Sequence, residues 1–432
     1  METALAAPGL RYGPVRKLAF ILPLALLLVA GLRWYSTVAA EPGGLEAITR
    51  RSDFVSNLTG AYMISHGEGQ QLYSLSAQAA AQNRVLAPYR VLVGTELLPY
   101  NHLPFEALLT APAVALGLPY PVVFGLWSLL MLATLALSLR LLWQVAPVSG
   151  GWLPVLVLAA LSYGPVTRSF VLGQNSPLVL LGLCGLYAGI TRKSNMWSGA
   201  ALVLLALKPQ VLPLVLLLLV LQRRWQILAI FGGLLGALCL LTVPLLGISW
   251  PLDYARLLVG VAGWGNAGAI DPSIMHNWRG LATVLFGNSL PSLVTPLYLA
   301  LSLASAGLVA WTWWRLRAAA NPSATGDDSQ RELLLWALVG LLAVPTSLHL
   351  NPHDLTLLIF PAWLVAAYAL RAGTEKPVSV LLLGLLWADY ALLTLLDQSS
   401  LVVIGVLLVV ATALLLLTQL PLQSTRRVEH LG

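Results

Sequence analysis

The chain has 432 residues, of which 58% are hydrophobic and only 9% are charged. Soluble globular domains carry about 25% charged residues, so this composition excludes an ordinary soluble enzyme or nucleic-acid-binding domain. The formal net charge of +7 therefore bears on orientation in a membrane rather than on affinity for nucleic acid.

Long apolar segments dominate the sequence from Leu18 to Leu420. Segments of about 20 apolar residues cross a hydrocarbon core of about 30 Å as helices. A porin-like barrel would instead show strands of about 10 residues with alternating polarity. We expect an all-α polytopic protein that forms a single integral membrane domain over residues 1–432, with about 11 to 13 membrane-inserted segments. Residues 18–38 follow a short basic lead-in and read as a retained first helix.

The longest polar stretch, residues 39–103, contains two predicted amphipathic helices. The first begins near Asp53 and is predicted to end at Gly67, which acts as a stop signal. The second runs from about Ser74 to Leu86. Helices of this kind lie on a membrane surface rather than crossing it. One face of the first helix is predicted to carry Phe54, Leu58, Ala61, Tyr62 and Ser65.

Three further segments break the pattern of full-length spans. Residues 104–117 are too few for an ordinary span and suggest a short or re-entrant element. Residues 198–221 are interrupted at Lys208, which is followed by proline; we expect two short helices, 198–207 and 211–221, with Lys208 at the tip of the hairpin. Residues 318–331 read as a cytoplasmic linker loop.

Basic residues set the expected orientation. Arg11, Arg16 and Lys17 precede the first span, so the N-terminus is expected to be cytoplasmic. The same side would hold the further positive clusters Arg192-Lys193, Arg223-Arg224, Arg315 with Arg317, Arg371 with Lys376, and Arg426-Arg427. The extracytoplasmic side would then hold the first loop, the turn 173–175, the loop 250–288 and the turn 349–354.

The polar residues that hydropathy does not explain collect on that extracytoplasmic face. Ionisable groups at membrane depth are costly and mark candidate functional sites, so we expect them to share one cavity. His66 and His102 are expected to be solvated loop residues, His430 belongs to the C-terminal tail, and Cys184 and Cys239 are expected to be packing residues. The candidate set is Asp53, Arg168, Gln174, Asn175, Lys208, Asp271, His276, Asn277, Arg279, His349, His353 and Asp354.

Each strong candidate also has a structural interpretation. Asp53 precedes a helix and is either its N-cap or a general base that accepts a proton from a hydroxyl. Lys208 either extends its ammonium to the interface or serves as a cation for an anionic group. Gln174 and Asn175 form either an ordinary turn or a pair of amides that bind sugar hydroxyls. Asp354 either caps the next helix or stands beside a phosphate contact from His353.

Several kinds of chemistry have no sequence signature here. The sequence contains no Walker A motif and no dinucleotide fingerprint. No histidines and carboxylates have the close spacing of a metal site. The free energy for a reaction must then come from the substrate itself or from an ion gradient.

Taken together, these residues resemble a known pattern, that of the polyprenyl-phosphate-sugar-dependent glycosyltransferases of the GT-C superfamily. The chain is most similar to glycosyltransferase family 87, which includes bacterial α-mannosyltransferases of phosphatidylinositol mannoside synthesis. The resemblance extends from Asp53 to about Pro361. In chain order it is carried by Asp53-Phe54, Tyr62, Gly67, Leu72-Tyr73, Leu98-Pro99-Tyr100, Pro104, Gly173-Gln174-Asn175, Ser198-Gly199-Ala200, Leu207-Lys208-Pro209, His276-Asn277 with Gly280, and the His349–Pro361 segment.

The resemblance implies a reaction and roles for these residues. A hexose, with mannose as the first candidate, would pass with inversion from a polyprenyl-phosphate donor to a lipid or glycan hydroxyl on the extracytoplasmic side of the cell membrane. Asp53 would be the base. Cation density at the leaving phosphate would come from Lys208, Arg168, Arg279 or His353, with the choice between His349 and His353 open.

The same resemblance sets the expected partners. These are the lipid-linked donor, the acceptor and membrane lipids, with no nucleic acid, no metal and no other cofactor. The sequence is also compatible with two alternatives to a glycosyltransferase. The interruption at Lys208 is also typical of a transporter or lipid flippase, and the hydrophobic composition alone would suit a non-catalytic membrane scaffold.

Overall fold

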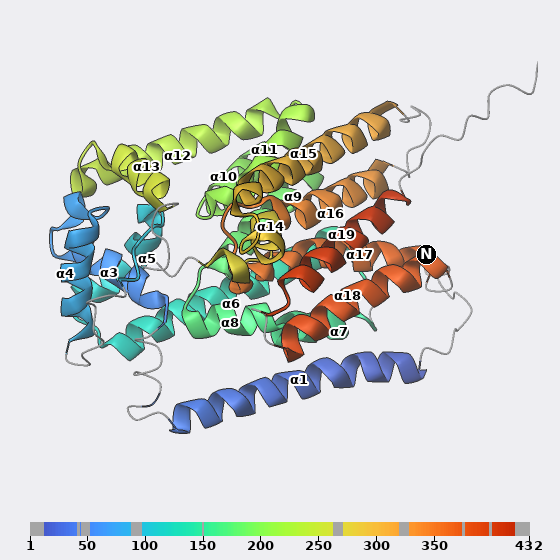
Figure 1. Cartoon of the computed structure of the whole chain (residues 1–432), viewed down its shortest axis with the longest axis horizontal. Coiled ribbons are helices and arrows are strands. Elements are labelled where there is room, and N and C mark those ends of the chain that lie inside the picture. The colour runs from blue at the N-terminus through green and yellow to red at the C-terminus, as the bar shows by residue number, and fades with distance from the viewer. Residues whose placement is uncertain are drawn as a thin grey trace, which may run out of the picture.

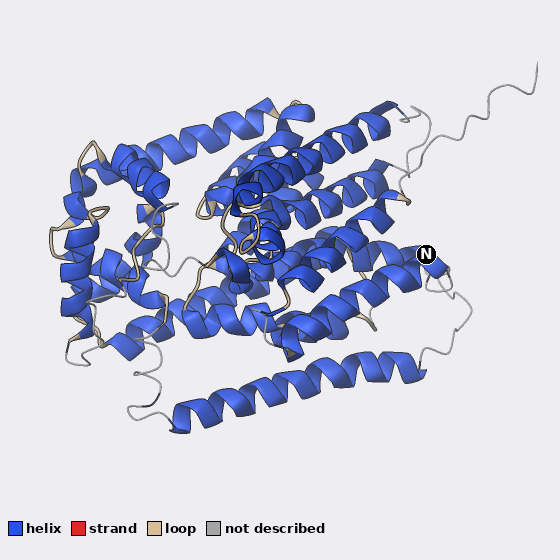
Figure 2. Ribbon diagram, in the orientation of Figure 1, coloured by secondary structure: helices blue, strands red, loops and turns tan. Residues whose placement is uncertain are grey.

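The computed structural model describes residues 13–40, 44, 52–87, 97–148, 151–261, 271–318, 328–373, 376–396 and 400–419. Every regular element in these ranges is a helix, and none of them contains a strand (Figure 2). The prediction of an all-α protein is therefore confirmed.

The helices follow one another closely along the chain. Proline stands in the first turn of several of them, where its missing N–H costs nothing. The first part of the chain forms α1 (Gly13–Ala40), α3 (Phe54–Ser65), η1 (Gly69–Gln71), α4 (Leu75–Leu86), α5 (Pro104–Ala115), α6 (Tyr120–Val145), α7 (Leu153–Ser162), α8 (Gly164–Leu172) and α9 (Ser176–Thr191). The second part forms α10 (Asn195–Leu205), η2 (Pro209–Val211), α11 (Leu212–Leu221), α12 (Trp225–Leu246), α13 (Trp250–Val261), η4 (Pro272–Ile274), α14 (Trp278–Phe286), η5 (Pro291–Leu293), α15 (Val294–Ala318), α16 (Asp328–Thr346), η6 (Pro352–Leu358), α17 (Ile359–Ala372), α18 (Pro377–Leu395) and α19 (Val402–Leu417).

Many of these helices are candidates to span the membrane. Six helices of the described residues are long and apolar enough to span, and the number rises to eight if each of two bent pairs counts as one span. Three shorter apolar helices, α5, α9 and α19, bring the membrane-inserted candidates to the lower end of the predicted range. The chain is a polytopic membrane protein.

The two predicted irregular segments have the expected form. Residues 104–117 fold as the short helix α5. The 198–221 region forms α10 and α11, which are bent by 119° at the break before Pro209. Lys208 lies at that break with non-helical angles (φ −123°, ψ 79°), because a following proline disfavours the helical conformation. The predicted linker 318–331 lies largely outside the described residues.

The polar first loop folds into a compact group of helices. In Figure 1, α3, α4, α5 and α13 gather at one end of the molecule, and the long helices run away from them. We call these four helices the cap. Aromatic side chains hold the cap together, with the Tyr73 ring centroid 5.2 Å from Tyr254 and 6.3 Å from Trp250. The first loop and α13 thus share one small core.

Helix α3 differs from its sequence prediction. It ends at Ser65, just before Gly67 (φ +76°), as expected. However, most of its residues are buried and not only one face, because α4 and α5 both pack against it. Gly60 also lets the Tyr100 ring, from the segment between α4 and α5, lie close to α3, since a Cβ at Gly60 would be 3.0 Å from that ring. The one-sided amphipathic pattern was therefore wrong for this helix.

Candidate active site

A cavity of about 370 Å³ lies between the cap and the membrane helices. It is bounded by the start of α3, the α8–α9 turn, the α10–η2 break and the segment from α16 to η6. The structure brings to this cavity six of the polar residues singled out in the sequence: Asp53, Gln174, Lys208, His349, His353 and Asp354.

Three consecutive residues of the α8–α9 turn each bind a different carboxylate. Gln174 Nε2 donates to Asp53 Oδ2 at 2.8 Å. Asn175 Nδ2 donates to Glu106 Oε2 at 2.6 Å, and Ser176 Oγ donates to Asp354 Oδ1 at 2.9 Å. A single turn therefore fixes three acids from three separate segments relative to one another.

Gly173 gives this turn its shape. It closes α8 in the left-handed conformation (φ +65°), which glycine adopts without strain. Its carbonyl accepts a hydrogen bond from Trp127 Nε1 at 2.9 Å. A Cβ at Gly173 would lie 2.5 Å from the Cβ of Phe54, the neighbour of Asp53.

Replacing Gly173 with alanine should lower the free energy of unfolding by about 2 kcal/mol or more, because strain in the left-handed region adds to the collision with Phe54. Thermal unfolding of the purified protein measures this. The matched control is Gly125→Ala, since Gly125 lies in α6 with nothing within 4 Å of its Cβ position; alanine there should be neutral or slightly stabilising. Equal effects of the two substitutions would contradict the role given to Gly173.

Asp53 stands at the N-cap position of α3, as the sequence suggested. However, it has helical backbone angles and its side chain makes no capping hydrogen bond, so capping does not account for its carboxylate. Burial raises the pKa of this carboxyl above its usual value, while the hydrogen bond from Gln174 and the nearby positive charge of Arg168 act in the opposite direction. Raising the pKa of a carboxylate makes it a stronger base.

Lys208 and Asp354 form a buried ion pair. The two residues are only 4% and 3% exposed, and Lys208 Nζ donates to Asp354 Oδ1 and to Ser176 Oγ at 3.1 Å. Of the two interpretations of Lys208, the one that extends its ammonium to the interface is therefore wrong. Asp354 also caps the start of η6, one of the two interpretations made from the sequence, because its Oδ2 accepts a hydrogen bond from the Asn351 N–H at 3.1 Å.

Two of the histidines that line the cavity, His349 and His353, have different surroundings. His353 is buried, with Nε2 3.5 Å from Asp354 Oδ1. His349 Nε2 lies 3.4 Å from Asn351 Nδ2, and its Nδ1 has no partner among the described residues. Burial lowers the pKa of His349 to about 4, so this ring is neutral at pH 7. It can exchange hydrogen bonds with a ligand but supplies no positive charge.

The remaining candidates lie away from the cavity lining. Asn277 caps α14, where its Oδ1 accepts from the Gly280 N–H at 2.7 Å and its Nδ2 donates to the Ser347 carbonyl at 2.9 Å. Arg168 and Arg279 are half-buried on α8 and α14 and do not line the cavity.

The model of glycosyltransferase family 87 matches residues 102–345, which is more than half of the chain. The chain belongs to glycosyltransferase family 87. No curated protein and no solved structure matches it. The protein is thus a membrane glycosyltransferase.

The family 87 match includes only some of the residues that line the cavity. Gln174 and Lys208 lie inside the matched residues, whereas Asp53 precedes them and Asp354 follows them. The roles of Asp53 and Asp354 therefore depend on the structure and on the resemblance described above.

One polar pair of this family 87 protein, His102 and Glu106, has no motif in the sequence that marks it. His102 lines the cavity instead of being solvated, and its Nδ1 lies 3.2 Å from Glu106 Oε2. Glu106 is only 3% exposed, and its Oε1 accepts from Asn57 Nδ2 at 3.3 Å. A lone acid at the third position of the apolar segment 104–117 was the available signal. Among the described residues, no three His, Cys, Asp or Glu side chains are grouped as a metal site.

Proposed function

We propose that this glycosyltransferase transfers a hexose from a polyprenyl-phosphate donor to a hydroxyl of a lipid or glycan acceptor, with Asp53 as the base. Mannose is the first candidate sugar. The observation that carries the proposal is the single cavity in which Asp53, oriented by Gln174, is joined by the buried Lys208–Asp354 pair. A base for the acceptor and a cation for the leaving group are the two parts that such a transfer requires.

The reaction is a direct displacement at the anomeric carbon. The acceptor O–H bond breaks and its proton passes to the Asp53 carboxylate. The acceptor oxygen forms the new glycosidic bond while the bond from the anomeric carbon to the phosphate oxygen breaks. Polyprenyl phosphate leaves with that electron pair, and one displacement inverts the anomeric configuration.

Lys208 is the candidate contact for the leaving phosphate. An ammonium has three N–H donors, and Asp354 and Ser176 take two of them, so one remains for a phosphate oxygen. The neutral His349 ring can add a hydrogen bond. Asp354 balances the charge of Lys208 when the cavity holds no donor, because an unpaired buried ammonium would be strongly unfavourable.

The proposed side of the membrane follows from charge and helix direction. In Figure 1 both α1 and α12 begin on the side away from the cap and run toward it. Arg223-Arg224 immediately precede α12, and Arg16-Lys17 lie near the start of α1. The positive-inside rule makes that end cytoplasmic, which supports a cavity on the extracytoplasmic side of the cell membrane.

The test is a sugar-transfer assay that compares several donors with the purified protein in detergent. Polyprenyl-phosphate-linked mannose, glucose and arabinose, each radiolabelled, are compared with a nucleotide-linked mannose, and total membrane lipid serves as the acceptor. We expect label to enter a new lipid or glycan from one polyprenyl-phosphate donor only. Transfer from the nucleotide sugar alone would contradict the proposal. No transfer in detergent, with movement of lipid-linked sugar across vesicles, would favour a transporter, for which the bent α10–α11 pair is the supporting feature.

The pH dependence of transfer follows from the surroundings of Asp53. The base acts when ionised, so kcat/KM should fall on acidification, with a midpoint above the ordinary carboxyl value of 3.8 because burial raises the pKa. The Gln174 hydrogen bond favours the ionised form, so Gln174→Leu should move the midpoint to higher pH. The exposed Arg256→Met is the control that leaves it in place. A midpoint that stays or moves down in Gln174→Leu would contradict this account.

A further inference from the structure

A second cavity, of about 100 Å³, lies between α7, α17 and α18. It shares no lining residue with the active-site cavity. The helices α17 and α18 are both candidate membrane spans, so this space lies at membrane depth. We call it the α17–α18 groove, defined by Leu156, Tyr163, Trp363, Leu383, Trp387 and Asp389.

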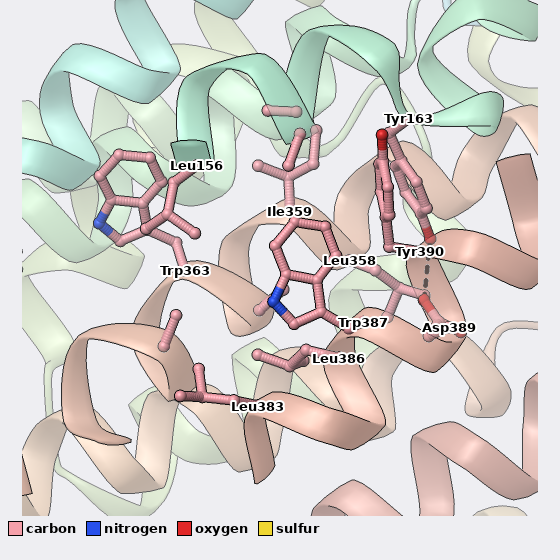
Figure 3. Close-up of a pocket in the computed structure, with 14 residues that line it drawn as sticks. Leu156, Tyr163, Leu358, Ile359, Trp363, Leu383, Leu386, Trp387, Asp389 and Tyr390 are labelled. Atoms are coloured by element: carbon pink, nitrogen blue, oxygen red, sulfur yellow. Dashed lines mark hydrogen bonds between the residues drawn. The ribbon is translucent and has the colours of Figure 1, made fainter. Parts of the chain in front are cut away.

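The groove has one polar end and one apolar end. In Figure 3, Tyr163, Tyr390 and Asp389 lie together at one end, while Leu156 and Trp363 lie at the other. An apolar cavity of about 150 Å³ binds a molecule the size of benzene. The groove, at about 100 Å³, is smaller than that, so it suits a few carbons of one hydrocarbon chain with a polar group at its end.

The polar end is incomplete. Tyr163 Oη donates to Asp389 Oδ2 at 3.1 Å, and Tyr390 Oη is engaged with Ser162 Oγ at 2.6 Å. The other carboxyl oxygen, Asp389 Oδ1, is buried and has no hydrogen-bond partner among the described residues. A buried polar atom without a partner is costly. An ionisable residue within a membrane span marks a functional site by default.

When ionised, the Asp389 carboxylate only accepts hydrogen bonds, so a hydrogen-bond donor would complete it. A hydroxyl supplies that donor, whereas a phosphate would bring negative charge to an acidic group. We propose that the α17–α18 groove binds a hydroxyl-bearing membrane lipid, with one hydrocarbon chain beside Trp363 and the hydroxyl donating to Asp389 Oδ1. This site is separate from the proposed donor and acceptor site, and it does not depend on the identity of the transferred sugar.

The experiment uses the full-length protein in detergent and two photoreactive probes. One is a monoacylglycerol with a diazirine in its chain, and the other is the same molecule with both hydroxyls methylated. After irradiation, labelled peptides are identified by mass spectrometry. We expect labels on α17 and α18, about tenfold weaker for the methylated probe, because a hydrogen bond to a charged group is worth about that factor.

Two variants separate the groove from general hydrophobic labelling. Asp389→Leu should abolish the preference for the hydroxyl probe, and Ala362→Trp should block labelling by filling the groove. The control is Leu381→Trp, on the exposed face of α18, which should label as the wild type does. Equal labelling by both probes, or a preference that survives in Asp389→Leu, would overturn the proposal and leave Asp389 as a protonated or hydrated residue. Displacement of the probe by polyprenyl phosphate would assign the groove to the donor chain and also overturn it.

Discussion

Replacing Lys208 with methionine should lower the free energy of unfolding by about 3 to 5 kcal/mol, because the substitution leaves Asp354 as an unpaired buried charge. Both partners are almost fully buried, so water cannot compensate for the loss. Reversible unfolding in mixed micelles measures the effect.

An exposed ion pair provides the control. Arg256 Nη1 lies 3.1 Å from Asp253 Oδ1 on the surface of α13, and exposed pairs contribute about 1 kcal/mol or less. Arg256→Met should therefore change stability little. The double variant Lys208→Met with Asp354→Leu should recover part of the loss, since it removes both charges. If Lys208→Met destabilised no more than Arg256→Met, the buried pair would not have the role assigned to it.

Asp53→Asn should reduce sugar transfer by about 10²- to 10⁴-fold, the usual contribution of a positioned general base. Asparagine keeps the shape of the side chain, and its oxygen can still accept the hydrogen bond from Gln174. We therefore expect the variant to insert and to unfold at nearly the wild-type temperature. Initial rates with the active donor, measured beside thermal unfolding, separate loss of chemistry from loss of structure.

The control for this variant is Asp253→Asn, the same chemical change at an exposed site on α13. It should retain the wild-type rate. Near-wild-type transfer by Asp53→Asn would remove Asp53 as the base. Comparable losses in both variants would point to a general effect of charge on the cap.

Local sequence signals predicted the features of this protein that depend on short segments of chain. Length and hydrophobicity identified the membrane helices, and the proline after Lys208 predicted the break between α10 and α11. Gly67 and Ser74 marked the end of one cap helix and the start of the next. In each case the physical cause lies in the residue itself or in its immediate neighbour.

Contacts between distant segments could not be predicted in the same way. The partner of Lys208 is Asp354, far along the chain, so the lysine alone could not decide between an interfacial position and a role as a buried cation. The burial of α3 depends on α4 and α5. The sequence of α3 reveals only its more hydrophobic face, because the other face is buried by these distant helices. Glu106 is stabilised by Asn57, Asn175 and His102; without those partners an acid in an apolar segment gives no indication of its role.

The most direct test of the proposed mechanism is an experimental structure with a non-hydrolysable polyprenyl-phosphonate sugar bound. The proposal predicts the sugar in the cavity between the cap and the membrane helices, with the anomeric carbon toward Asp53 and the phosphonate within hydrogen-bond distance of Lys208 Nζ. A donor bound elsewhere, or one whose phosphonate faces Asp53, would contradict it.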